Sequence, residues 1–289
     1  MMFRTRFAPS PTGYLHLGHA YSACLAHDMA KAQGGEMLLR IEDTDAGRCR
    51  PEYETAILED LRWLGLDWPE PVRRQSEHLA SYASALDKLS ALGLTYPCRC
   101  TRGDIRAALS APQEGAGTPD IGPDGPVYPG TCRGRSMAEA QPGNAIRLDM
   151  GRALALVAGR APGFTENGPL HAGRHALDPQ ALLTGTGDVV LARRDIGTAA
   201  YHLAVVVDDV DQGITEVVRG VDLFAATPLH VLLQTLLELP TPSYWHHDLI
   251  RDENGKRLAK RDDARAIRRY RAEGVSPAEL REMVGLPPP

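Results

Sequence analysis

The sequence has 289 residues, of which 43% are hydrophobic and 24% charged, and its formal net charge is -5. A chain of this size can bury a sizeable core, so we expect one compact body of two or three lobes. Its longest apolar stretches, such as 203–207 and 231–237, fall far short of the ~20 residues that a membrane-spanning helix needs. Residues 1–6 also lack the basic-then-apolar layout of a secretory signal, so we expect no membrane partner and a cytoplasmic location.

Strand and helix patterns alternate along the chain in the order of a crossover unit. A strand at Phe3–Ala8 is followed by a Pro/Gly turn, a helix at Gly18–Gln33 and a strand at Met37–Glu42. The further predicted elements are helices at Glu52–Leu64, Glu77–Leu92 and Pro228–Leu239, strands at Asp188–Ala192 and Glu216–Arg219, and an apolar segment at Ala199–Val207 that fits either type. This alternation predicts an α/β fold with a Rossmann-like, doubly wound parallel sheet that is interrupted by an insertion.

The insertion contains three of the five cysteines. Residues 112–129 are rich in Gly and Pro, which indicates an irregular loop. Cys98, Cys100 and Cys132 flank this loop, and their spacing favours a metal site plus two free thiols over a disulfide framework. Three thiolates in a reducing compartment suggest zinc, and three free thiols without a metal are the alternative.

The first motif that carries chemistry follows the first predicted strand. Residues 6–19 read RFAPSPTGYLHLGH, so His16, Gly18 and His19 arrive at the start of a helix directly after a turn. The N–H groups and dipole of a helix N-terminus favour bound phosphate. Two imidazoles beside a triphosphate can also donate hydrogen bonds to oxygens that gain charge as the α-phosphate is attacked. In isolation, a His-x-x-His pair more often binds a metal or caps the helix.

A basic segment near the end of the sequence forms the second motif. Residues 251–271 carry nine basic and four acidic side chains, which favours a phosphate-bearing partner although the whole chain is acidic. Within this segment, residues 256–261 read KRLAKR after a turn-prone stretch. A loop with a lysine at its tip, here Lys260, can close over a triphosphate, neutralise the departing pyrophosphate and exclude water. An isolated match of this kind indicates a solvated basic turn.

Together, the two motifs resemble the signature sequences of class I aminoacyl-tRNA synthetases, His16–His19 matching the first and Arg257–Arg261 the second. Three further stretches resemble the glutamyl-tRNA synthetases of that class, in the same order: Arg6–Gly13, Leu39–Asp45, and Tyr201–Asp209 continuing to Val218–Gly220. The resemblance runs from about residue 4 to residue 261. It implies ATP-dependent activation of L-glutamate, with Mg accompanying ATP.

The resemblance also implies roles for individual residues. It assigns catalysis to His16, His19 and Lys260, ATP binding to these three and to Gly18, Arg257, Leu258 and Ala259, and glutamate binding to Arg6, Ala8, Ser10, Glu42, Tyr201 and Arg219. These residue types suit the ligand, because two carboxylates need cationic donors and an ammonium needs an acid. A mutual salt bridge between Arg6 and Glu42 is the structural alternative. Ala259 stands where the family commonly has serine, which predicts reduced rather than absent activation.

The chain departs from a full-length glutamyl-tRNA synthetase after the second motif. Only 28 residues follow Arg261, so we expect no anticodon-binding domain. In this respect the chain resembles a truncated paralogous family, the glutamyl-queuosine tRNA(Asp) synthetases. That family resemblance implies tRNA-independent activation of glutamate and its transfer to the queuosine base at the wobble position of tRNA(Asp). It also implies one structural zinc held by Cys98, Cys100, Tyr128 and Cys132, although His171 or His175 would be a more common kind of fourth ligand.

The expected organisation has three parts. A split Rossmann-like catalytic domain covers 1–95 and 183–240, an inserted zinc-binding and RNA-contacting subdomain of the acceptor type covers 96–182, and a lysine-loop and stem-contacting region covers 241–289. We expect a monomer whose partners are ATP, L-glutamate and queuosine-containing tRNA(Asp). Two other functions stay open: a minimal glutamyl-tRNA synthetase that charges the 3′ end of tRNA(Glu), and a non-catalytic RNA-binding relative.

Overall fold

A mostly parallel arrangement of strands forms the centre of the molecule in the computed structural model, which describes residues 2–110, 121–194, 198–250 and 265–288. The strands of its first sheet, in the order β1-β2-β3, are β1 (Arg4–Phe7), β2 (Glu36–Ile41) and β3 (Arg73–Arg74). The strands of its second sheet, in the order β11-β12-β8-β9, are β11 (Glu216–Gly220), β12 (Ser243–His247), β8 (Gly163–Glu166) and β9 (Gly173–Ala176). All neighbouring pairs are parallel except β8 and β9.

The two sheets meet along β1 and β11. The backbone N–H of Thr215 donates to the carbonyl oxygen of Arg4 at 3.0 Å, which brings the start of β11 beside β1. Across the centre, the strands therefore run β3-β2-β1-β11-β12, the order of a doubly wound fold. In such a fold, ligands bind at the carboxyl ends of the strands, near the point where the strand order reverses.

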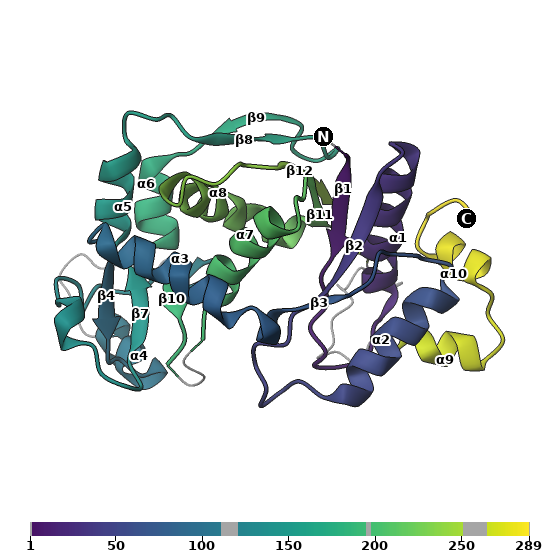
Figure 1. Ribbon diagram of the computed structural model, residues 1–289, viewed down its shortest axis with the longest axis horizontal. Coiled ribbons are helices and arrows are strands. Elements are labelled where there is room, and N and C mark those ends of the chain that lie inside the picture. The colour runs from purple at the N-terminus through teal and green to yellow at the C-terminus, as the bar shows by residue number, and fades with distance from the viewer. Residues whose placement is uncertain (1, 111–120, 195–197, 251–264, 289) are drawn as a thin grey trace.

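Helices on the side of β1 and β2 enclose one hydrophobic core. These helices are α1 (Leu17–Ala32), α2 (Pro51–Trp63), α9 (Ile267–Ala272) and α10 (Pro277–Met283). Pro51 begins α2, where its missing N–H has no cost, and Ser276 forms a capping box with Glu279 at the start of α10. Ile267 and Leu280 are fully buried in this core, so the last described helices pack against α1 and α2 at one end of the molecule (Figure 1).

A second core lies toward the opposite end of the molecule (Figure 1). Its helices are α3 (Leu79–Ala91), α5 (Met150–Val157), α7 (Tyr201–Asp211) and α8 (Thr227–Leu236). Beside them stands an antiparallel sheet in the order β10-β7-β4, formed by β10 (Val190–Ala192), β7 (Ala145–Leu148) and β4 (Thr95–Cys98). The smaller elements are α4 (Arg102–Ser110), β5 (Ile121–Gly122), β6 (Gly125–Pro126) and α6 (Pro179–Ala181).

Each element predicted from the sequence is present, with its ends displaced by a few residues. Of the ambiguous segment Ala199–Val207, residues from Tyr201 onward form α7, whose apolar residues are buried on all sides, while Ala199 forms a β-bridge with Ala192. Residues 96–182 were expected to form one insertion, but their strands belong to two different sheets. β7 lies in the antiparallel sheet, whereas β8 and β9 extend the central, mostly parallel strands beyond β12. Among the described residues, no helix combines the length and apolarity needed to cross a membrane.

Candidate active site

A cavity of about 530 Å³ opens at the carboxyl ends of β1, β2 and β11. The predicted residues that line it are Arg6, Ala8, Ser10, His16, Gly18, His19, Glu42, Tyr201 and Arg219. The structure thus brings together every predicted glutamate-binding residue and the three residues His16, Gly18 and His19 of the first motif. Arg257, Leu258, Ala259 and Lys260 lie outside the described residues. The chain on either side of them is at the cavity, because Ile250 lines it and Ala266 forms a β-bridge with His16.

The two histidines of the first motif cap the helix α1 with one ring nitrogen each. His16 Nδ1 accepts a hydrogen bond from the backbone N–H of Gly18 at 3.1 Å, and His19 Nδ1 accepts one from the backbone N–H of His16 at 3.1 Å. Since each Nδ1 is an acceptor, both rings are neutral and carry their proton on Nε2. A side chain at Gly18 would press on the His16 ring, since its Cβ would lie 3.1 Å from Cε1. Capping the helix and binding phosphate are therefore compatible roles for these histidines. Each ring uses Nδ1 for the cap, which leaves its Nε2–H group in a fixed position to donate to a phosphate.

Ion pairs hold Arg6 and Glu42 in the lining of the cavity. Arg6 Nε donates to Asp209 Oδ1 at 3.1 Å, and Arg40 Nη1 donates to the same oxygen at 2.7 Å. Glu42 lies 3.4 Å from Arg40 Nη2. Burial raises the pKa of Glu42, although the charges of Arg40 and Arg6 oppose the shift. Arg6 and Glu42 form no ion pair with each other, so the salt bridge weighed as the structural alternative is not what holds them.

The sequence motifs did not single out several residues that complete this site. Asp209 lies within one of the family-like stretches, yet nothing in its spacing indicated that it would join Arg6 to Arg40. His247 lines the cavity and accepts from the Ser22 hydroxyl at 2.7 Å, because its Nδ1 donates to the carbonyl oxygen of Asp248. A His-His pair after a short apolar run carries no recognisable signal on its own.

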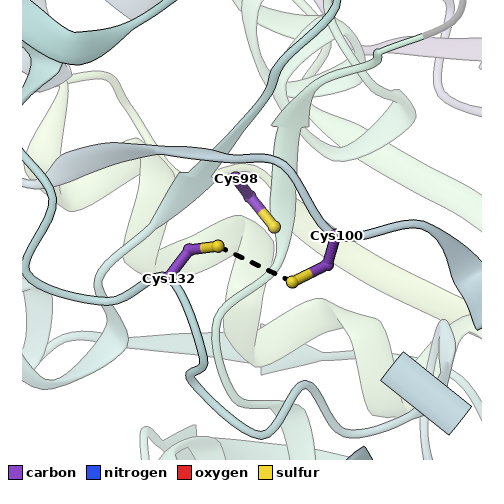
Figure 2. Close-up of side chains that lie close together, drawn as sticks. All are labelled: Cys98, Cys100 and Cys132. Carbon is purple, nitrogen blue, oxygen red and sulfur yellow. Dashed lines mark hydrogen bonds between the residues drawn. The ribbon is translucent and has the colours of Figure 1, made fainter. Parts of the chain in front are cut away.

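The three cysteines predicted to bind a metal lie close together in space. In sequence they are far from the residues that line the cavity. Figure 2 shows the sulfurs of Cys98, Cys100 and Cys132 pointing toward one another, with Cys100 and Cys132 3.6 Å apart. The Tyr128 hydroxyl lies 3.4 Å from the sulfurs of Cys98 and Cys100. Burial by itself would raise the pKa of Cys132. Hydrogen bonds with the backbone of Arg99 and with the other side chains of the cluster outweigh this effect and lower the pKa to about 7. Burial instead raises the pKa of Cys100 to about 11, so the tendency to ionise near neutral pH belongs to Cys132 and not to Cys100.

Three separations between these donors are close to those expected around a tetrahedral zinc ion. Zn–S bonds of about 2.3 Å and a Zn–O bond of about 2.0 Å give tetrahedral edges of roughly 3.8 Å between sulfurs and 3.5 Å between sulfur and oxygen. The observed 3.6 Å and 3.4 Å separations lie close to these values. Among the described residues, no His, Asp or Glu joins the three cysteines. His171 and His175 instead stack on Phe224 and Phe164, so neither takes the fourth position.

Comparison with known proteins supports the same assignment as the cavity. The sequence model of the family described as tRNA synthetases class I (E and Q), catalytic domain, matches residues 2–121 and 170–287. A glutamyl-Q tRNA(Asp) synthetase of Rhodobacter capsulatus is 56% identical over 98% of this chain and 99% of its own length. Another, from Nitratidesulfovibrio vulgaris, is 42% identical over 96% of this chain and 84% of its own.

Solved structures extend the comparison to the fold. A crystal structure of a glutamate tRNA ligase from Elizabethkingia meningosepticum, in complex with its amino acid, has a TM-score of 0.69 and 29% identity. The match covers 91% of this chain and 52% of that one, so this chain spans about half the length of that ligase. The chain therefore belongs to the class I tRNA synthetases (E and Q) and, within them, to the glutamyl-Q tRNA(Asp) synthetases.

Proposed function

We propose that this chain activates L-glutamate with ATP, without needing tRNA, and transfers the glutamyl group to the queuosine base at the wobble position of tRNA(Asp). One observation carries the proposal: two arginines and the largely buried carboxylate of Glu42 share a single cavity with the capped N-terminus of α1. The names of relatives that match almost the whole chain point to the same reaction. Since the acceptor is a tRNA, we expect the enzyme in the cytoplasm.

In the first step, a carboxylate oxygen of glutamate attacks the α-phosphate of Mg-ATP, and pyrophosphate leaves. Glu42 binds the ammonium group of the substrate glutamate, while Arg6 and Arg219 bind the carboxylates of the same substrate. The Nε2–H groups of His16 and His19 donate to phosphate oxygens as their charge grows, and we assign Lys260 to the same task on the basis of the family resemblance. The protein thus contributes mainly positioning and charge stabilisation.

In the second step, a hydroxyl of the queuosine cyclopentene-diol attacks the glutamyl-adenylate, and AMP leaves. The glutamyl group is thereby linked to the base by an ester. We propose that the region around the cysteine cluster contacts the RNA, as the corresponding inserted subdomain was expected to do. When bound by Cys98, Cys100, Tyr128 and Cys132, zinc would link β4 to the 128–132 loop and stabilise that region.

The proposal is tested by glutamate-dependent exchange of pyrophosphate into ATP in the absence of tRNA. Exchange with L-glutamate, and at least a hundredfold weaker exchange with L-glutamine, is the expected result, since a site that holds a carboxylate between arginines rejects a neutral amide. Exchange that requires tRNA, or that proceeds equally with glutamine, would contradict the proposed first step.

A further inference from the structure

Arg219 is held almost entirely by neutral acceptors. Its Nε donates to His246 Nε2 at 3.0 Å and its Nη1 to His230 Nδ1 at 3.2 Å. Its Nη2 donates to Thr227 Oγ1 at 2.8 Å and to the carbonyl oxygen of Leu223 at 3.3 Å. A guanidinium has five N–H groups, so one on Nη1 is left without an acceptor among the described residues. Unlike Arg6 and Arg40, which both contact Asp209, Arg219 forms no ion pair with a described carboxylate.

The donors of Arg219 fix the protonation of both histidines. Arginine can only donate, so His246 Nε2 and His230 Nδ1 carry no proton. The proton of His246 therefore lies on Nδ1, which donates to Glu166 Oε2 at 2.5 Å. Burial and the neighbouring Arg219 lower the pKa of His246 to about 4 and that of His230 well below its ordinary value, which agrees with two neutral rings.

Glu166 is itself fixed by the backbone. Its Oε1 accepts from the N–H groups of Gly168 and His246, both at 2.8 Å. A Cβ at Gly168 would come within 2.6 Å of both Glu166 Oε1 and the carbonyl oxygen of His246, so only glycine allows this close approach. The relay from Arg219 through His246 to Glu166 is thus fully hydrogen-bonded, and it is rigid at its far end.

A second relay runs from Arg219 in the other direction. His230 Nε2, which must carry the proton, donates to His202 Nδ1 at 2.9 Å, and His202 Nε2 donates to Asp124 at 3.0 Å. Asp124 stands in the turn between β5 and β6, four residues before Tyr128. Both relays therefore start at the guanidinium and end at a carboxylate that does not touch it.

We propose that His246 and His230 are positioning residues that fix the Arg219 guanidinium through neutral acceptors, so that its charge and remaining N–H serve the substrate carboxylate. This inference rests on the proposed function. A carboxylate in direct contact with Arg219 would neutralise it and weaken the preference for an anionic substrate. A neutral acceptor fixes its orientation and leaves its charge to be matched by glutamate, whereas glutamine would leave a buried cation without a partner.

The test compares His246→Leu, His246→Gln and His246→Glu in tRNA-free pyrophosphate exchange. Leucine cannot accept the Arg219 hydrogen bond, whereas glutamine can accept it and also donate to Glu166. We expect H246L to raise the KM for glutamate by at least about tenfold while the KM for ATP stays within about twofold, and H246Q to recover most of that loss. H246E should lower the ratio of kcat/KM for glutamate over glutamine, because it places a carboxylate against Arg219.

Two additions keep the test decisive. If H246L does not fold because Glu166 Oε2 loses its donor, H246L/E166Q removes the buried charge and keeps the acceptor for the N–H of Gly168. His175→Leu is the matched control, since this histidine stacks on Phe164 and has no bond to Arg219. Equal changes in both KM values, or H246Q behaving like H246L, would overturn the positioning role. Absence of glutamate exchange in the unaltered protein would instead overturn the proposed function.

Discussion

Replacing Glu42 with glutamine should weaken the binding of glutamate without lowering the stability of the fold. The change keeps the shape of the side chain and removes a largely buried carboxylate that lies 3.4 Å from Arg40 Nη2. Because burial raises the pKa of Glu42, the folded protein disfavours the ionised form that the substrate ammonium needs. Arg40 retains its bonds to Asp209 and Gln212 in the variant. We therefore expect the free energy of unfolding at pH 7.5 to stay the same or to rise.

The expected loss in function follows from the ammonium contact. A hydrogen bond to a charged partner contributes about 1.5–3 kcal/mol, which corresponds to a rise of roughly 10- to 150-fold in the KM for glutamate. The KM for ATP should not change. Glu36→Gln is the control, because Glu36 lies at the start of β2, the strand that ends just before Glu42, and pairs with Arg4 rather than lining the cavity. A variant E42Q that unfolds more easily but keeps its KM for glutamate would refute the assignment, since Glu42 would then be structural.

Three further predictions concern other parts of the molecule. Tyr128→Phe should bind zinc at least about tenfold more weakly in competition with a chromophoric chelator, whereas His175→Ala should bind it as the unaltered protein does; equal affinities would remove the phenol from the site. His19→Ala should lower kcat for pyrophosphate exchange by about 100- to 1000-fold, as loss of a transition-state donor does, and a change of less than tenfold would leave His19 only a capping role. Asp60 is buried, and burial raises its pKa to about 6. The folded state therefore holds this proton more tightly than the unfolded state, and stability falls as pH rises from about 4 to 6. At pH 8, the free energy of unfolding of Asp60→Asn should exceed that of the unaltered protein by up to about 3 kcal/mol. Below about pH 4 the two free energies should be equal, and urea titrations at both pH values measure the difference.

The apolar patterns of the sequence predict the strands and helices at the centre of the fold, whereas the roles of the residues around the cavity come from the family resemblance. Arg6, Glu42 and Arg219 each stand at the carboxyl end of a strand whose apolar pattern is visible, and the carboxyl ends of parallel strands meet at one edge. The His16 and His19 motif likewise depends only on a turn followed by a helix. The patterns thus locate the elements that carry such residues, and the family resemblance adds which of those residues bind the ligand.

Other parts of the fold give no such local signal. β4 contains Pro97, which argues against a strand, and the structure tolerates it because β4 lies at the edge of its sheet and pairs only with β7. β9 is too exposed to show alternation. The relay that links Glu166 to His246 joins residues 80 positions apart, and a buried histidine with one donor and one acceptor looks in sequence like any other. These contacts exist only once the chain has folded.

The measurement that tests the central claim most directly locates the product of the second step. Radiolabelled glutamate and ATP are offered with separate pools of queuosine-containing tRNA(Asp), tRNA(Asp) without queuosine, and tRNA(Glu), and nuclease digestion then shows where the label lies. We predict label only in the anticodon loop of queuosine-containing tRNA(Asp). Label on the terminal adenosine of tRNA(Glu) would contradict the proposed function and identify a minimal glutamyl-tRNA synthetase.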